Sequence, residues 1–357
     1  MIKLNCPIVP DIAKYTSLIE KVNKNGWYTN FGPMHEELTE KLSSYLGVDN
    51  LLLVSNGTLA LQVAYETLGV KKAITTPYSF VATASTLAWQ KKDIIYADVH
   101  KDSGNICFDN VQEILRDRPD YDSVVATHVF GNPCEVDKFI DIEQKTNVIY
   151  DAAHAFGVKA SGKSILSYGD ASTISFHATK VFHTVEGGGI VFKTKAHFEE
   201  AKRLINFGIE LDKGIQSVGI NAKLNEYQAA AGLVLMDNID LIIEKRVSLF
   251  ELYRESLSDV ISFPNWSENA TYNGAYMPVF CDSEEQLIHL MQSLEACGIQ
   301  TRRYFYPSLN AVVKASEISN TTNSNELAKR SLCLPLHYYM TNKDVLTVTE
   351  SIKNALK

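Results

Sequence analysis

Three short motifs carry residue types suited to chemistry on a phosphorylated ligand. The first, Ser55-Asn-Gly-Thr58, stands between a short apolar run and a segment with apolar residues at helical spacing. The first turn of a helix offers unpaired backbone N–H groups and the positive end of the helix dipole, and both favour a phosphate. Gly57 permits close approach of the backbone, and Thr58 adds a hydroxyl. A simple helix N-cap made of the same residue types is the alternative.

The second motif is Tyr150-Asp-Ala-Ala-His154, in which Asp151 ends a predicted strand. Ligands of open α/β sheets bind outside the carboxyl ends of the strands. A carboxylate at that place can pair with a cationic ring nitrogen, and His154 could orient the ring. The alternative is an aspartate that caps the next turn, with a histidine on the surface.

The third motif is Ser175-Phe-His-Ala-Thr-Lys180, followed by Glu186-Gly-Gly-Gly189. Lys180 comes just after another predicted strand end, so it should project over the same crevice as Asp151. A solvated loop lysine is the alternative. His177 and His183 stand nearby, but no carboxylate or cysteine completes a plausible ligand set, and we expect no metal.

The three motifs together match the needs of pyridoxal phosphate. Its phosphate needs a helix N-terminus, its ring nitrogen needs a carboxylate, and its aldehyde needs a lysine amine. The sequence therefore predicts pyridoxal phosphate as the cofactor, with Lys180 as the lysine that binds it covalently.

Short apolar runs alternate with helical segments around these motifs. We expect strands at Leu51–Val54, Ala73–Thr76, Ile94–Val99, Ser123–Thr127, Val148–Asp151, Ala171–Phe176 and Gly189–Phe192, and helices at Thr58–Leu68 and Ser79–Trp89. Such alternation predicts an α/β fold with a mostly parallel sheet flanked by helices.

The pattern changes after Met236. A long helix is expected at 238–257, then a strand at Tyr276–Phe280, a helix at Glu284–Cys297, a mobile polar loop at Ser316–Glu326 and a closing helix at Asp344–Leu356. We predict a large cofactor-binding domain at 1–237 and a smaller C-terminal α/β domain at 238–357.

Composition narrows the function class. The 357 residues carry a net charge of −8, which disfavours a nucleic-acid binder. No apolar run is long enough for a membrane span, the N-terminus lacks signal-peptide character, and the six scattered cysteines suggest reduced thiols. We expect a cytoplasmic enzyme.

The motifs resemble those of the DegT/DnrJ/EryC1/StrS family of sugar aminotransferases, which are fold-type I pyridoxal phosphate enzymes. The resemblance extends over nearly the whole chain. Besides the three motifs, it rests on 26–33, 76–83, 219–224, 228–230, Tyr306-Pro307 and 334–336.

The resemblance implies roles for individual residues. Lys180 is the Schiff-base lysine, Asp151 pairs with the ring nitrogen, and His154 lies beside the ring, on which Phe80 stacks. The phosphate is held by Gly57, Thr58 and Ser175, and by Asn221 and Lys223 of a second subunit, because family members are dimers with shared active sites. Relatives usually carry Arg or Asn where this chain has Lys223.

The resemblance also implies a substrate. We expect glutamate to donate an amino group to C4 of dTDP-4-keto-6-deoxy-D-glucose, giving dTDP-4-amino-4,6-dideoxy-D-glucose for O-antigen or another surface glycan. The candidate substrate contacts are Trp27, Thr29, His183, Arg302, Arg303 and Tyr306. The arginines could instead pair with nearby acids.

Three alternatives stay open. The first is amination at C3, although relatives that act there tend to show Tyr-Pro before the lysine. The second is a non-catalytic regulatory protein, whose expected sign, loss of Lys180 or Asp151, is absent. The third is a nicotinamide oxidoreductase, although no Gly-x-Gly-x-x-Gly follows the first predicted strand.

Overall fold

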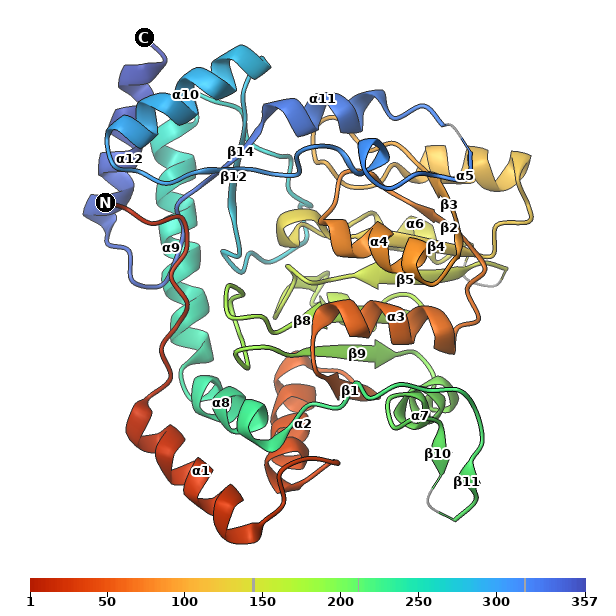
Figure 1. Cartoon of the computed structure of the whole chain (residues 1–357). Helices are drawn as coiled ribbons and strands as arrows, with labels where there is room; N and C mark the ends of the chain where they lie inside the picture. Colours follow the sequence, from red (N-terminus) through yellow and green to blue (C-terminus); the bar gives the residue numbers. More distant parts are fainter. Residues whose placement is uncertain (143–144, 211, 318) are drawn as a thin grey trace.

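A seven-stranded sheet forms the centre of the molecule (Figure 1). The computed structural model describes residues 1–142, 145–210, 212–317 and 319–357. The strands lie in the order β1 (Leu51–Val54), β9 (Gly188–Phe192), β8 (Ala171–Ser175), β5 (Asn147–Asp151), β4 (Ser123–Thr127), β2 (Lys72–Thr75) and β3 (Asp93–Tyr96). Neighbours from β8 to β3 are parallel, whereas β9 is antiparallel to both β1 and β8. The predicted α/β fold with a mostly parallel sheet is confirmed.

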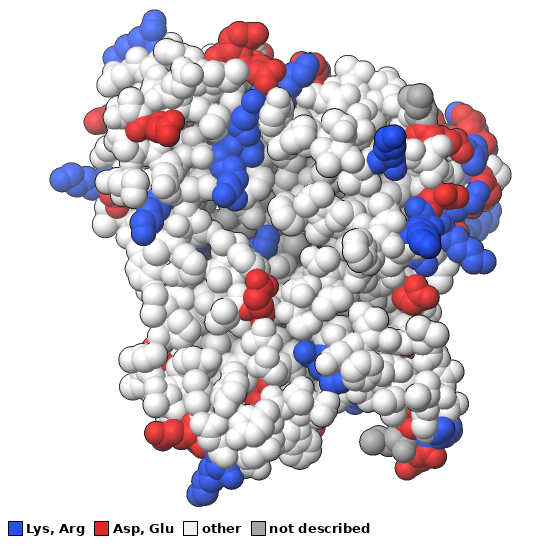
Figure 2. All heavy atoms as spheres, in the orientation of Figure 1, with Lys and Arg blue, Asp and Glu red and all other residues white. Residues whose placement is uncertain are grey.

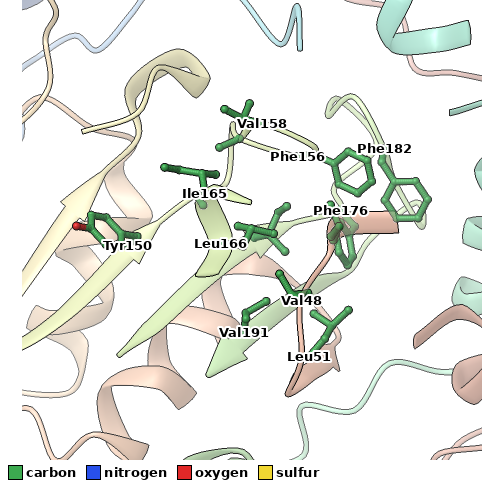
Figure 3. Close-up of a cluster of buried hydrophobic side chains, with 14 of the residues drawn as sticks. Val48, Leu51, Tyr150, Phe156, Val158, Ile165, Leu166, Phe176, Phe182 and Val191 are labelled. Atoms are coloured by element: carbon green, nitrogen blue, oxygen red, sulfur yellow. The ribbon is translucent and has the colours of Figure 1, made fainter. Parts of the chain in front are cut away.

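Both faces of the sheet are covered, so successive strand residues enter two different cores. In β1, Leu51 and Leu53 join one core, and Leu52 and Val54 join the other. The first core also takes side chains from α1 (Ile12–Asn25), α2 (Pro33–Leu46), α5 (Phe108–Asp117), α6 (Val136–Phe139) and α8 (Glu226–Met236). The second takes them from α3 (Gly57–Thr67), α4 (Val81–Trp89) and α7 (Lys195–Leu204). Figure 3 shows part of the first core, with Phe156, Phe176 and Phe182 close together.

The C-terminal part has a core of its own. The long helix α9 (Ile239–Leu257) leads to the antiparallel sheet of β12 (Met277–Phe280), β14 (Ser331–Leu334) and β13 (Arg302–Arg303). Helices α10 (Glu284–Ala296) and α12 (Asn342–Ala355) pack in the same core. These separate cores support a division near residue 237, which stays a proposal.

Part of the C-terminal region returns to the large sheet. The Leu309 N–H donates to the Pro77 carbonyl at 2.9 Å, and the Tyr96 hydroxyl donates to the Val313 carbonyl at 2.9 Å. The segment that follows differs from expectation, because the predicted mobile loop at Ser316–Glu326 gives way at Thr322 to α11 (Thr322–Arg330). Ile318 lies outside the described residues.

A tertiary cap explains this helix. The Asp98 carboxylate, beyond the end of β3, accepts the Asn323 N–H at 2.9 Å and the Ser324 N–H at 2.8 Å. A carboxylate at a helix N-terminus satisfies unpaired amides and complements the dipole. Because this cap comes from a residue 226 positions away, the polar local sequence alone suggested a loop.

Short elements complete the chain: η1 (Val129–Gly131), β6 (Lys159–Ala160), β7 (Lys163–Ser164), η2 (Ile165–Ser167), β10 (Ile209–Glu210), β11 (Gly214–Ile215) and η3 (Leu309–Ala311). Among the described residues, no helix has both the length and the apolar character needed to cross a membrane.

Candidate functional site

A cavity of about 560 Å³ opens where the carboxyl ends of β1, β4, β5 and β8 meet. Parallel strands end at one edge of a sheet, so residues distant in sequence collect there. Its lining includes seven of the predicted cofactor residues: Gly57, Thr58, Phe80, Asp151, His154, Ser175 and Lys180. Figure 2 shows a hollow near the middle of the molecule, with lysine or arginine and carboxylate side chains around it.

The N-terminus of α3 forms one end of the cavity. The Asn56 side chain accepts the Leu59 N–H at 2.8 Å, and Gly57 and Thr58 line the cavity in the first turn. Gly57 is needed for space, because a Cβ there would lie 2.9 Å from the Ser175 Cβ. Gly188 is needed for the same reason, because a Cβ there would meet the Asn56 carbonyl carbon at 2.7 Å. The two glycines thus let three chain segments meet at the N-terminus of α3, which favours an anion.

Asp151 is held in one orientation at the end of β5. It is 5 % exposed, accepts the Thr83 hydroxyl at 2.7 Å and accepts the Ala153 N–H at 3.1 Å. Burial raises the pKa of this carboxyl, while the hydrogen bonds from Thr83 and Ala153 oppose the rise. A cation placed in the cavity would therefore stabilise the Asp151 carboxylate.

A chain of hydroxyl groups continues behind Asp151. The Ser79 hydroxyl lies 2.7 Å from the Thr83 hydroxyl and 2.9 Å from the Thr127 hydroxyl. All three side chains are buried. Ser79 follows β2, Thr127 ends β4, and Thr83 stands in the first turn of α4. This chain fixes the hydroxyl that Thr83 offers to Asp151.

Lys180 lines the same cavity as Gly57 and Asp151. Its Nζ lies 3.3 Å from the Tyr276 hydroxyl and 5.7 Å from the centre of the Tyr276 ring. Burial lowers the pKa of Lys180 to about 8, while the Asp151 charge opposes the fall. Near pH 8 about half of Lys180 is therefore the neutral amine, the form that attacks an aldehyde.

Two side chains place Tyr276 beside Lys180. The Asn273 amide donates to the carbonyls of His154 and Phe156 at 2.9 and 3.0 Å. Arg246 of α9 is 2 % exposed and donates to the carbonyls of Gly274 and Ala275 at 2.8 and 3.0 Å. The turn before Tyr276 is therefore held by hydrogen bonds both to the segment that follows β5 and to helix α9.

His154 and Phe80 supply ring surfaces. The Nδ1 of His154 accepts the Phe130 N–H at 3.2 Å, and burial lowers the pKa of its ring well below the usual value, so the ring is neutral. Phe80 is 55 % exposed although it is a large apolar side chain on the cavity wall. An exposed aromatic face in a concave site suits stacking on a flat ligand.

These observations fit pyridoxal phosphate. The cavity has the N-terminus of a helix for a phosphate, the buried Asp151 carboxylate, an amine of lowered pKa and an exposed aromatic wall. Gly57, Thr58 and Ser175 would hold the phosphate, Asp151 the ring nitrogen and Lys180 the aldehyde carbon.

Two of the predicted substrate residues, Arg302 and Arg303, lie in different surroundings. Arg302 lines the cavity and lies 3.2 Å from the Tyr304 hydroxyl. Arg303 differs from expectation, because its guanidinium donates to Glu284 at 2.6 Å and lies over the Tyr306 ring at 3.5 Å, outside the cavity lining. Adjacent residues of a strand point to opposite sides, so β13 can turn only one of the two arginines to the cavity.

His183 also differs from expectation. It is buried, its Nε2 bonds to the Ile8 carbonyl at 2.8 Å, and its Nδ1 accepts the Val185 N–H at 3.2 Å. One ring nitrogen thus bonds to the N-terminal segment and the other to the neighbouring Val185 amide, which leaves neither for a substrate.

Besides Arg303 and His183, five predicted residues lie outside the cavity lining of their own chain: Trp27, Thr29, Tyr306, Asn221 and Lys223. The Trp27 indole donates to the Thr29 carbonyl in the connection between α1 and α2. The exposed Asn221 forms a bridge with Asn206, and Lys223 Nζ donates to the Asn206 side chain at 2.8 Å.

Sequence reasoning missed Thr83, Tyr276, Tyr304 and Glu186. Thr83 stands in the 76–83 segment, where it is one of several small polar residues and the sequence gives no reason to prefer it. Tyr276 begins a predicted strand, and its neighbours signal only the strand. Glu186 could have been found, because it adjoins the glycines that follow Lys180.

Comparisons with known proteins agree with this site. A family model described as the DegT/DnrJ/EryC1/StrS aminotransferase family matches residues 11–353. The dTDP-4-amino-4,6-dideoxy-D-glucose transaminase of Shigella dysenteriae is 38% identical, over 97% of this chain and 97% of its own. A transaminase of the same name from Escherichia coli is 34% identical, over 96% of each chain. The crystal structure of DesI in the presence of its TDP-sugar product has a TM-score of 0.93 and 28% identity, over 100% of this chain and 93% of DesI.

Proposed function

Because the chain belongs to the DegT/DnrJ/EryC1/StrS aminotransferase family, whose members depend on pyridoxal phosphate, we propose that it transfers the amino group of glutamate to C4 of dTDP-4-keto-6-deoxy-D-glucose. The product is dTDP-4-amino-4,6-dideoxy-D-glucose. The observation that carries the reaction type is the convergence of Lys180, Asp151 and the N-terminus of α3 on one cavity.

The chain's own groups account for the chemistry. When bound, pyridoxal phosphate supplies an electrophilic aldehyde and a ring that withdraws electrons from the carbon beside the transferred nitrogen. The Asp151 carboxylate, fixed by Thr83 and Ala153, would hold the ring nitrogen in its protonated form. The first turn of α3 would fix the phosphate, which sets the distance between the aldehyde carbon and Lys180.

Lys180 has a second role as the base and acid of the reaction. The neutral amine at Nζ takes the proton from the α-carbon of the donor and, in the second half, returns a proton to C4 of the sugar. The Tyr276 hydroxyl, 3.3 Å away, holds the amine over the cavity in both halves. The lowered pKa of Lys180, about 8, keeps both protonation states available near neutral pH.

The substrate is proposed from the relatives and from the rim of the cavity. The two transaminases above share one name, and DesI was crystallised with a TDP-sugar product. Arg302 adds a cation at the cavity wall, which suits a diphosphate or a carboxylate. The gluco configuration of the new amine follows from the names of the two transaminases.

We further propose a homodimer whose active sites lie at the interface. Large apolar residues are exposed in the 207–220 segment next to Asn221 and Lys223, and Val218 is 93 % exposed. Exposed apolar patches of this kind mark association surfaces. Mixing a Lys180→Ala protein with an Asn221→Ala protein should restore activity through hybrid dimers, whereas a fully active monomer by light scattering would refute the shared site.

We place the enzyme in the cytoplasm and in the synthesis of a surface glycan such as O-antigen. All six cysteines are free thiols, which suits a reducing compartment. The downstream glycan is proposed from the product, an amino sugar on a nucleotide carrier.

Two experiments test the function. Borohydride reduction of the pyridoxal phosphate-loaded enzyme should leave the pyridoxyl group on the peptide that contains Lys180, and a pyridoxyl group on a different lysine would contradict the site. The enzyme should then be incubated with glutamate and a panel of 3-keto and 4-keto nucleotide sugars. NMR of the product should show the amine at C4 in the gluco configuration, and exclusive use of a 3-keto sugar would overturn the C4 assignment.

A further inference from the structure

A second group of reactive side chains lies away from the cofactor cavity, in the loop that joins β3 to α5. This loop runs from Asp98 to Cys107 and is closed by hydrogen bonds from the Cys107 N–H to the Asp98 carbonyl and from the His100 N–H to the Asn105 carbonyl, both at 2.9 Å. The closed loop places His100 and Cys107 on the wall of one cavity, although six residues separate them in sequence. Glu135, just before α6, lies on the other side of the ring.

The three side chains form a relay of nucleophile, base and orienting acid. The Nε2 of His100 lies 2.8 Å from Glu135 Oε2, so Nδ1 is the ring nitrogen left for Cys107. A carboxylate on one imidazole nitrogen fixes the tautomer and stabilises the imidazolium that forms when the other nitrogen takes a proton. Lys138 holds Glu135 in place through an ion pair of 2.7 Å with Glu135 Oε1.

The position of Cys107 adds to this activation. Cys107 is the N-cap residue of α5, a helix of ten residues, so the amides of the first turn and the helix dipole favour a negative sulfur. The hydrogen bond with His100 lowers the pKa of the Cys107 thiol, with a smaller contribution from the amides of Asn110 and Asp109. The hydrogen bonds with Cys107 and Glu135 raise the pKa of His100 to about 9. The thiolate form of Cys107 and the protonated form of His100 therefore stabilise each other.

Charges around this pair are mixed. Lys101 and Asp102 of the loop and Asp98 line the same space, Asp109 stands on α5, and Lys138 stands on α6. Asp98 accepts hydrogen bonds from Asn323 and Ser324 of α11. These hydrogen bonds offset the Asp98 charge, and the largest effect on the pKa of the Cys107 thiol comes from His100.

A separate cavity makes the sulfur accessible. About 440 Å³ of space lies between the loop and the segment before α11, and His100 and Cys107 both line it. Asn110, Asn320 and Asn323 also line this cavity, and none of its lining residues lines the cofactor cavity. Three amide side chains and Lys101 suit a small peptide that carries carboxylates.

We propose that Cys107 is a reactive thiol, activated by His100 and Glu135, that exchanges with a small peptide disulfide and so forms a reversible modification site. The Cys107 sulfur attacks one sulfur of the disulfide, a new S–S bond forms, and the old S–S bond breaks. The departing thiolate takes the proton that His100 received from Cys107. One thiol and one disulfide thus become one mixed disulfide and one thiol, without an added oxidant.

Cys297 provides a matched control within the same chain. Cys297 is exposed at the end of α10, whereas Cys107 is only partly exposed, so steric access alone favours Cys297. At a pH below the pKa of a thiol, lowering that pKa raises the thiolate fraction more than it lowers the intrinsic nucleophilicity of the thiolate, with a net gain in rate of about threefold per unit. Cys107 should therefore react faster than Cys297.

The experiment uses the full-length enzyme loaded with pyridoxal phosphate. Oxidised glutathione is added at about pH 6.5, well below the pKa of an ordinary cysteine, and peptide mass spectrometry follows each of the six cysteines over time. Preferential glutathionylation of Cys107, reversed by dithiothreitol and absent in Cys107→Ser, is the expected result. An equal or faster rate at Cys297 would overturn the proposal.

Two variants test the activation. His100→Gln and, to a smaller degree, Glu135→Gln should slow the modification of Cys107 toward the rate of Cys297, and iodoacetamide should give the same order of rates. Unchanged transamination in Cys107→Ser and unchanged thermal unfolding in His100→Gln show that each variant is folded. If His100→Gln leaves the rate at Cys107 unaltered, the relay is refuted.

Discussion

The floor and the rim of the cofactor cavity are built in different ways. The floor consists of Gly57, Asp151, Ser175 and Lys180, which follow or end strands of the central sheet, and its carboxylate is buried and hydrogen-bonded twice. The rim consists of Phe80, Glu186, Arg302 and Tyr304, and its Phe80 and Glu186 side chains are each about half exposed. Contacts within one chain thus fix the positions of the floor residues. The rim residues Phe80 and Glu186 have exposed surface on which a ligand or a second subunit can pack.

This difference separates the chemistry from the choice of substrate. The floor groups act on the cofactor, and their charges work only if burial and hydrogen bonds hold them still. On the rim, Phe80, Glu186 and Arg302 are exposed, so they can contact a nucleotide sugar, an amino acid or a second subunit. Changes on the floor should therefore lower kcat, and changes on the rim should raise KM.

The largest effect is expected from Asp151→Asn. An amide cannot hold the ring nitrogen of the cofactor in its protonated form, so kcat should fall on the order of 10³-fold while the phosphate contacts keep the cofactor bound. Stopped-flow absorbance of each half-reaction measures the loss. Asp122→Asn is a control at the opposite edge of the sheet, where Asp122 accepts the Lys71 and Lys72 amides, and it should leave kcat unchanged.

Thr83→Val should have a smaller effect of the same kind. The hydroxyl lost is a donor to a charged carboxylate, worth roughly 1.5–3 kcal/mol, so kcat should fall about ten- to a hundredfold. Because the Thr83 hydrogen bond lowers the pKa of Asp151, its loss raises that pKa, and the acid limb of the pH–kcat profile should move to higher pH.

Thr83→Ser tests whether the hydroxyl itself matters, since it keeps the donor and loses only a methyl group. Recovery of both kcat and the acid limb in Thr83→Ser is expected. If valine and serine at this position behave alike, Thr83 has no role in positioning Asp151.

On the rim, Arg302 and Arg303 form a matched pair of neighbours. Arg302→Ala should raise the KM for a substrate by about one to two decades, because an arginine contact to an anion is charge-assisted. Arg303→Ala should leave both KM values unchanged and lower the melting temperature, because Arg303 joins β13 to Glu284 of α10. Initial rates with varied glutamate or varied sugar nucleotide show which KM changes, and a larger KM effect at Arg303 would reverse the assignment.

The smallest effect is expected in the unmutated enzyme, from the pH dependence of the reaction of Lys180 with the cofactor. The pKa of Lys180 is lowered to about 8 from the 10.5 of an ordinary lysine, so its neutral fraction rises with pH through about 8. The rate at which the apoenzyme gains visible absorbance on addition of pyridoxal phosphate should therefore reach half its maximum near pH 8. A model lysine amide should need a pH above 10 under the same conditions, and coincident profiles would show that the cavity does not alter Lys180.

The sequence predicted the floor better than the rim. Gly57, Asp151 and Lys180 each stand beside an apolar run that forms a buried strand, so strand ends could be located from local pattern. On the rim, Arg302 and Arg303 have the same residue type and adjacent positions. Only the register of β13 against β14 shows which of them turns to the cavity.

The sequence by itself determined which strand ends would meet, because the carboxyl ends of parallel strands lie at one edge and each end carried a distinctive residue. The tertiary structure decided every contact between residues with no local signal. Thr83 reaches Asp151 across 68 residues, Tyr276 reaches Lys180 across 96, and Asp98 caps α11 across 226. Such contacts depend on how helices and sheets pack, and a residue's local pattern records the element to which it belongs but not the neighbour that packing brings to it.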